Sequence, residues 1–177
     1  NHLVATAAVA QQYGIRSVGI VRGQYEDLTP TLTACKEYGM ELAFVPQSQY
    51  KLKSDEIWLN ELLEKYNTPY VIPEGGANDY GRKGAEEIAH YISSHYTHVC
   101  VSAGTGTTLI GLRNALPAIL TILGYVPMKM GGHIQSDIAP FITSSQNVNW
   151  HLFDKYHFGG FGKWTDTLID FMNEFYK

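Results

Sequence analysis

The sequence predicts an α/β fold with two lobes, residues 1–73 and 74–177, each built from a mostly parallel sheet with flanking helices. Apolar, β-branched runs alternate along the chain with segments whose apolar residues recur at helical spacing, and glycine or proline separates them. A glycine-rich stretch, residues 104–108, stands between an apolar run and a helix-compatible segment, which is typical of a strand, a tight turn and a helix. This alternation favours parallel strands with helices packed on them.

The first lobe contains three helix and strand pairs. Asn1 is a good helix cap, and no helix breaker precedes Gly14. Pro30 suits the first turn of the second helix, and Gly39 suits its end. We expect helices at residues 3–13, 30–38 and 55–66, and strands at residues 17–22, 41–45 and 70–72.

The second lobe begins after a hinge near residues 72–74. Glycine-rich punctuation follows at once, at residues 73–78, and the first helix of this lobe is expected to bury Ile88 and Ile92. We expect helices at residues 81–94, 109–116 and 165–176, strands at residues 99–101, 121–125 and 150–154, and a loop near the site at residues 128–135.

The glycine-rich stretch has the composition of an anion-binding turn. Two glycines let the backbone turn sharply and come close to a ligand, and the start of the next helix leaves N–H groups directed outward. Such a turn most often binds phosphate, and three threonine hydroxyls favour a phosphate monoester over a carboxylate. The alternative is a glycine-rich turn without a ligand. The five residues are Gly104, Thr105, Gly106, Thr107 and Thr108.

The same stretch disfavours nucleotide cofactors. A Walker loop needs a Gly-Lys pair before serine or threonine, and no lysine lies between Lys83 and Lys129. A dinucleotide-binding fingerprint needs a third glycine where this chain has Leu109. A nucleotide-dependent enzyme therefore has only the glycine loop in its favour.

Composition and charge limit the class of protein further. The 177 residues are 45% hydrophobic and 17% charged, as in ordinary globular α/β proteins, and the formal charge of −4 argues against nucleic-acid binding. No apolar run reaches the roughly 20 residues of a membrane span and no signal peptide is seen, so we expect a cytoplasmic protein with no membrane partner. The histidines show no ligand-pair spacing, so no metal site is predicted. Cys35 and Cys100 are expected to be reduced thiols, in a helix and in a buried strand.

Three separated motifs resemble those of one enzyme family. They are Asn-His-Leu at residues 1–3, Tyr-Val-Ile-Pro-Glu-Gly-Gly-Ala-Asn at 70–78 and Ala-Gly-Thr-Gly-Thr-Thr at 103–108, with shorter phrases at 19–23, 38–40 and 156–160. Together, in this order and over essentially the whole chain, they resemble the family of 1-aminocyclopropane-1-carboxylate deaminase and D-cysteine desulfhydrase. That resemblance implies fold type II of the pyridoxal-phosphate enzymes, similar to the tryptophan synthase β subunit, with the cofactor between two lobes.

The resemblance also implies roles for individual residues. Gly104, Thr105, Gly106, Thr107 and Thr108 would hold the phosphate of pyridoxal 5'-phosphate. The side chain of Asn1 would bind the phenolic oxygen of the cofactor ring, and Asn1 with His2 would meet the substrate carboxylate. A small amino acid, of the 1-aminocyclopropane-1-carboxylate or D-cysteine type, would yield a 2-oxo acid and ammonia. Relatives make a homodimer the expectation.

Some family features differ or are expected outside this chain. The catalytic Schiff-base lysine is expected upstream of Asn1, and a Tyr-x-Gly-Lys segment after Lys177. Phe161 stands near the substrate where relatives commonly have tyrosine, and we interpret it as a hydrophobic wall. Glu74 could orient substrate, although a carboxylate that bonds to its own loop is the favoured interpretation. A second hypothesis is a non-catalytic remnant that binds a phosphorylated small molecule.

Overall fold

The computed structural model describes residues 2–129, 133–143, 145, 147–160 and 162–176. The chain divides into two compact units, Asn1–Val71 and Ile72–Lys177, which are described separately. Both units combine parallel strands with flanking helices, so the predicted α/β class is confirmed.

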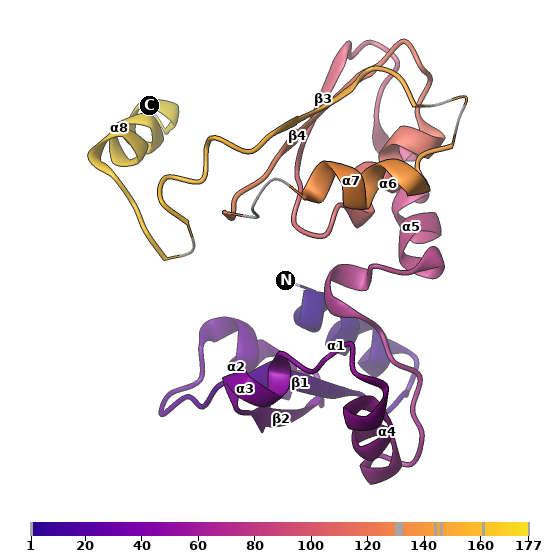
Figure 1. The fold of residues 1–177 in the computed structure, drawn as a ribbon, viewed down its shortest axis with the longest axis vertical. Helices are drawn as coiled ribbons and strands as arrows, with labels where there is room; N and C mark the ends of the chain where they lie inside the picture. Colours follow the sequence, from indigo (N-terminus) through magenta and orange to yellow (C-terminus); the bar gives the residue numbers. More distant parts are fainter. Residues whose placement is uncertain (1, 130–132, 144, 146, 161, 177) are drawn as a thin grey trace. The chain divides into compact units, whose positions relative to one another are not determined.

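Unit 1 is built on two parallel strands, β1 (Val18–Arg22) and β2 (Glu41–Val45), which pair from end to end (Figure 1). Helices α1 (His2–Gln12) and α2 (Pro30–Glu37) contact each other, and α2 also contacts β2. The small core joins Ala7, Cys35 and Met40, whose side chains are at most 3% exposed. Helices α3 (Gln47–Tyr50) and α4 (Glu56–Lys65) follow β2.

Local side-chain caps explain where the helices of unit 1 begin. Thr29 Oγ1 accepts the N–H of Leu32 at the start of α2, and Asp55 Oδ1 accepts the N–H of Trp58 at the start of α4. Gly39, with φ +81°, follows the end of α2. The helices and strands predicted before residue 67 are therefore confirmed within a few residues.

The strand expected at residues 70–72 is wrong. These residues have no strand partner among those the structure describes, and Tyr70, Val71 and Ile72 are 67%, 44% and 46% exposed. The β-branched composition favours an extended backbone, but a strand also needs a neighbour for its N–H and C=O groups.

Unit 2 contains a parallel sheet in the order β3 (His98–Ser102), β4 (Thr121–Tyr125), β5 (Trp150–Phe153). Helix α6 (Thr107–Ala115) supplies the buried Leu109, Ile110 and Leu112 to the core beside the sheet. Helix α5 (Asp79–Glu86) lies so close to α6 that a Cβ on Gly111 would meet Ala85 Cβ at 2.5 Å. The strands predicted at 99–101, 121–125 and 150–154 are confirmed.

The helix expected at residues 81–94 is shorter and changes type. α5 ends at Glu86 and continues as the 3₁₀ helix η2 (Glu87–Tyr91). Because a 3₁₀ helix has a tighter repeat, the later side chains rotate away from the predicted face. Ile88 is 42% exposed, so its predicted burial is wrong, whereas Ile92 packs partly buried against the core.

Helical segments also occur in the region between β4 and β5. α7 (Ile134–Ile138) begins within the loop predicted at 128–135, so that prediction is wrong at residues 134 and 135, and the 3₁₀ turn η3 (Ala139–Phe141) follows α7. Residues 130–132 of the predicted loop lie outside the described part. Helix α8 (Asp166–Phe175), capped by Thr165, closes the described chain (Figure 1) and confirms the helix predicted at 165–176.

The two cysteines differ in burial. Cys35 and Cys100 are both free thiols, as predicted, and Cys35 is fully buried. Cys100 is exposed, so the prediction of a buried strand position is wrong there. Along β3, Val99 and Val101 point to the α6 side and are partly buried, whereas Cys100 lies on the opposite face, which is exposed.

Candidate functional site

The glycine-rich stretch forms the predicted turn between β3 and α6. Ala103 donates its N–H to the carbonyl oxygen of Tyr125 at 2.8 Å, which fixes the end of β3 against β4. Gly106 then adopts the left-handed conformation, φ +82° and ψ −5°, as the N-cap of α6. Its carbonyl accepts the N–H of Ile110 at 2.9 Å. The four residues 103–106 thus connect the end of β3 at Ser102 to the start of α6.

The turn presents hydrogen-bond donors beside open space. The first N–H groups of a helix have no partner inside it, and the positive end of the helix dipole lies at the same place. The hydroxyls of Thr105 and Thr107 lie 3.0 Å apart, and Thr107 is only 8% exposed. A Cβ on Gly104 would meet no atom within 4 Å. These residues fit a phosphate group, with N–H groups and hydroxyls as donors and room for its oxygens.

The opposite side of the turn is closely packed. A Cβ on Gly106 would overlap Cγ1 of Ile138, which is 0% exposed in α7. Glycine is therefore required at position 106 by packing as well as by its positive φ.

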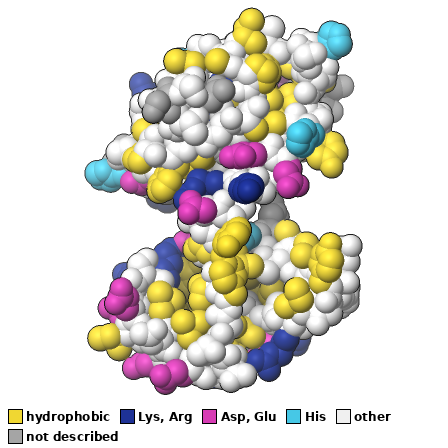
Figure 2. Space-filling model, turned by 90° about the vertical axis from the view of Figure 1, so that its right-hand side faces the viewer, with side chains coloured by type: hydrophobic (Ala, Val, Ile, Leu, Met, Phe, Trp, Pro, Cys, Tyr) yellow, Lys and Arg dark blue, Asp and Glu magenta, His cyan; other side chains and the backbone are white. Residues whose placement is uncertain are grey.

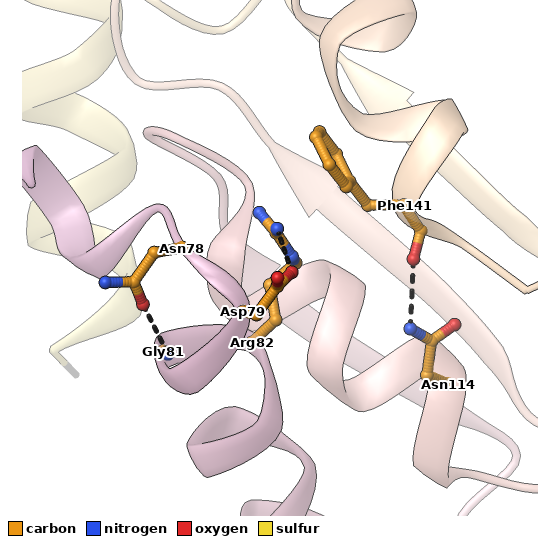
Figure 3. Close-up of polar contacts among 6 residues, drawn as sticks. All are labelled: Asn78, Asp79, Gly81, Arg82, Asn114 and Phe141. Atoms are coloured by element: carbon orange, nitrogen blue, oxygen red, sulfur yellow. Dashed lines mark hydrogen bonds and ion pairs between the residues drawn. The ribbon is translucent and has the colours of Figure 1, made fainter.

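The glycine-rich loop of the motif at residues 70–78 packs directly on this turn. Gly75 and Gly76 have φ +65° and +63°, and a Cβ on Gly75 would overlap the side chain of Thr105. Asn78 Oδ1 accepts the N–H of Gly81 at 2.8 Å and so caps α5 (Figure 3). Residues 74–78 and the phosphate-type turn thus form one continuous surface within unit 2.

An aromatic cluster lies at the same edge of the sheet. The rings of Tyr125 and Phe153 stack with centroids 5.1 Å apart, and the Tyr156 ring is 5.9 Å from that of Tyr125. The strand register places Ser102, Tyr125 and Phe153 side by side at the carboxyl ends of the strands. Ligands of parallel sheets bind at this edge. The motif at 156–160 contains Tyr156, but Tyr125 and Phe153 were not predicted as site residues, although Tyr125 is the last residue of the strand predicted at 121–125 and was a usable signal.

Of the remaining predicted site residues, the structure describes His2 and Glu74 but not Asn1 and Phe161. His2 begins α1 in unit 1 and is exposed. Asn1 and Phe161 lie outside the described residues, and the predicted roles of all three stay predictions. Glu74 is exposed in the loop that contacts Thr105.

The described residues form neither a metal-binding cluster nor a membrane-spanning helix. Within this part of the chain, no three or more His, Cys, Asp or Glu side chains gather as they would around a metal ion. None of its helices combines the length and the apolar character needed to cross a membrane.

Comparison with known proteins identifies the family. A sequence profile described as "Pyridoxal-phosphate dependent enzyme" matches residues 1–128, which include the turn at 104–108. The chain belongs to the family of pyridoxal-phosphate dependent enzymes. Pyridoxal phosphate, the predicted cofactor, is accordingly the cofactor of this family.

Curated relatives within this family carry a more specific name. Proteins of Pyrococcus horikoshii and Pyrococcus furiosus, both named "Putative 1-aminocyclopropane-1-carboxylate deaminase", are 29% and 31% identical to the chain over 190 and 191 residues. These alignments cover 98% and 96% of this chain but 58% and 57% of the relatives. The chain therefore spans little more than half the length of these pyridoxal-phosphate enzymes.

Solved structures share the fold of this chain. O-ureido-L-serine synthase superposes with a TM-score of 0.56 at 20% identity, over 86% of this chain and 54% of that protein. A hydrogen sulfide-producing enzyme from Fusobacterium nucleatum superposes with a TM-score of 0.54 at 16% identity, over 86% of this chain and 57% of that enzyme. The predicted fold type II of pyridoxal-phosphate enzymes is therefore confirmed.

Proposed function

We propose that this chain is part of a pyridoxal-phosphate deaminase or lyase that acts on a small amino acid, of the 1-aminocyclopropane-1-carboxylate or D-cysteine type. The products would be a 2-oxo acid and ammonia. The observation that carries the proposal is the turn at Gly106, which offers helix N–H groups and threonine hydroxyls at the carboxyl edge of a parallel sheet. The name of the two Pyrococcus relatives supports the substrate class.

The turn would hold the cofactor through its phosphate. Gly104 leaves room for the phosphate oxygens, and the first N–H groups of α6 would donate to them. The Thr105 and Thr107 hydroxyls, which already contact each other, would add two donors. When bound, pyridoxal phosphate withdraws electrons from the carbon next to the substrate amino group. The part of this chain is to fix the cofactor and to keep its surroundings ordered.

The aromatic cluster and the predicted substrate residues would shape the rest of the site. The rings of Tyr125, Phe153 and Tyr156 would exclude water beside the turn. The resemblance gives Asn1 and His2 the role of binding the substrate carboxylate, and His2 is the first residue of α1, where the helix dipole favours an anion. Phe161 would supply a hydrophobic wall in place of the tyrosine common in relatives. The roles of Asn1, His2 and Phe161 follow from the family resemblance, whereas that of the three rings rests on their place at the carboxyl edge of the sheet.

The proposal is tested by substrate turnover and by cofactor binding. The protein, encoded as in its own gene, is incubated with pyridoxal phosphate and 1-aminocyclopropane-1-carboxylate, D-cysteine or L-cysteine, and ammonia and 2-oxo acid are measured. We expect release from at least one of the first two compounds. Binding of the cofactor without release from any of them would instead support a non-catalytic remnant.

A double variant tests the phosphate turn separately. Replacing Thr105 and Thr107 together by alanine removes two hydroxyl donors, each worth about 1 kcal/mol or somewhat more toward a charged acceptor. The affinity for pyridoxal phosphate should therefore fall by roughly tenfold to a hundredfold. An unchanged affinity would remove the assignment of the turn.

A further inference from the structure

The segment from α7 to Thr143 runs along α6. At one end, Ile138 fills the space in which a Cβ on Gly106 would lie. At the other end, Phe141 and Thr143 reach Asn114, which is eight residues beyond Gly106 and near the end of α6. The segment therefore spans the helix from its phosphate-type turn to its last turn.

Asn114 ties this segment to the helix with both halves of its amide. Its Nδ2 donates to the carbonyl oxygen of Phe141 at 3.0 Å, and its Oδ1 accepts the N–H of Thr143 at 3.0 Å (Figure 3 shows the first bond). Each bond joins residues that are 27 or 29 positions apart. Hydrogen bonds at both edges of one amide hold the backbone of the segment in a single register on α6.

Arg82 holds the same segment from α5. Its guanidinium carbon lies 3.9 Å from the centroid of the Phe141 ring, and its Nη2 lies 2.6 Å from Asp79 Oδ1 (Figure 3). The Arg82 side chain is only 15% exposed, so the cation and the ring contact each other with little water between them. The ion pair with Asp79, whose side chain is 95% exposed, adds little to this contact.

We propose that Asn114 and Arg82 are positioning residues for the cofactor phosphate. Both residues hold Phe141 in place, and the segment that contains Phe141 in turn holds Ile138 against Gly106. Ile138 then keeps the turn in the conformation whose N–H groups face the phosphate. When the hydrogen-bond donors are held in place before binding, less conformational entropy is lost on binding, and the ligand binds more tightly. This inference rests on the proposed function of the turn.

The test separates the phosphate from the rest of the cofactor. Dissociation constants of the apoprotein for pyridoxal phosphate and for pyridoxal, which lacks the phosphate, are measured in Asn114→Ala and Arg82→Ala. We expect pyridoxal phosphate to bind about tenfold more weakly in each variant, which corresponds to the loss of one or two hydrogen bonds or a cation–π contact. The affinity for pyridoxal should stay within about twofold, whereas general loosening of the fold would weaken both ligands equally.

Controls keep the result interpretable. Arg82→Lys retains the cation over Phe141 and should recover most of the affinity. Asn60→Ala makes the same chemical change at an exposed position on α4 in unit 1 and should alter neither constant. If Asn114→Ala does not fold, Asn114→Asp keeps the acceptor for Thr143 but loses the donor to Phe141, and a loss of about threefold for pyridoxal phosphate is expected.

Gly106→Ala distinguishes failure of the inference from failure of the proposed function. This variant overlaps Ile138 directly and should lower the affinity for pyridoxal phosphate whatever Asn114 does. A loss in Gly106→Ala with no phosphate-specific loss in Asn114→Ala and Arg82→Ala would overturn the positioning role alone. No loss in any of the three variants would overturn the phosphate turn itself, and the positioning role with it.

Discussion

Single residues at the candidate site are constrained for different physical reasons. Gly104 has open space where a Cβ would lie, whereas Gly106 combines a φ of +82° with direct contact to Ile138. A glycine at 104 is useful because a ligand can come close, and a glycine at 106 is required by the backbone and by packing. The sequence predicts a glycine-rich turn but treats the two glycines alike.

The rates at which a thiol reagent labels Cys100 and Cys35 should differ, because Cys100 lies on the exposed face of β3 and Cys35 in the core of unit 1. Cys100 is exposed, whereas Cys35 is fully buried, and burial raises the pKa of the Cys35 thiol. Cys35 therefore has less thiolate at any given pH and is also out of reach of a reagent. We expect an aromatic disulfide reagent to label Cys100 at least about tenfold faster than Cys35, with the fast phase lost in Cys100→Ser.

The pH dependence of this behaviour has a defined sign. Because its pKa is raised, the Cys35 thiol holds its proton more tightly in the folded state than in the unfolded state. The protonated thiol therefore contributes to the stability of the fold below the ordinary thiol pKa of about 8.5, and this contribution is lost as pH rises above that value. Labelling of Cys35 should therefore accelerate as pH rises above that value. Equal rates for the two thiols would contradict the burial of Cys35.

At the scale of the element, α6 is fixed at its C-terminal end by a buried cation. Arg113 is 0% exposed and donates to the carbonyls of Leu116, Pro117 and Leu120 at 2.7–2.8 Å, and to that of Asn149 at 3.4 Å. These carbonyls follow α6 or precede β4 and β5, so one guanidinium joins the ends of three elements. Burial lowers its pKa, but the carbonyl dipoles and the negative end of the helix favour the charged form.

Arg113→Lys should be strongly destabilising although it conserves charge. One ammonium cannot reach the carbonyls that the planar guanidinium bonds, so buried acceptors lose their partners. We expect the free energy of unfolding of unit 2 to fall by about 2–4 kcal/mol in urea titrations. Arg16→Lys, at an exposed arginine that bonds the Tyr66 carbonyl at 3.2 Å, is the matched control and should cost less than about 0.5 kcal/mol. Similar losses in both variants would contradict the role of Arg113.

At the scale of the whole molecule, the two units have cores of unequal size. The cluster of unit 1 is centred on Ala7, Cys35 and Met40, whereas that of unit 2 extends over α6, β4 and α7. Hydrophobic side chains also reach the surface, as Figure 2 shows for one face, and Ile57 and Ile119 are 72% and 86% exposed. Exposed apolar area is where partners bind. The homodimer expected from the resemblance remains a prediction.

Unequal cores should separate the unfolding of the two units. Because buried apolar area supplies most of the stability, we expect unit 1 to unfold at lower urea than unit 2. The chain has three tryptophans, of which Trp58 lies in α4 and Trp150 in β5, and Trp164 also belongs to unit 2. Variants that keep only Trp58 or only Trp150, with Trp164 replaced in both, report each unit by fluorescence. Coincident transitions for the two reporters would show that the units unfold together.

The local features of this protein follow from its sequence alone. Thr29 and Asp55 cap the helices predicted at 30–38 and 55–66, and the strand, glycine turn and helix at residues 98–116 appear where the pattern placed them. Caps, turns and side-chain periodicity depend on residues within a few positions of one another, so a single sequence contains them. The family resemblance rests on such short motifs too.

Only the tertiary structure decided the contacts between distant segments. The unpaired residues 70–72, the exposed Cys100, the buried Arg113 and the contact of Ile138 with Gly106 each depend on what lies opposite in space. Local propensity states which backbone a residue favours, but burial and strand pairing depend on partners tens of residues away, which no local pattern specifies. The sequence therefore determined most of the elements, the phosphate-type turn and the family, and the packing determined what holds that turn in place.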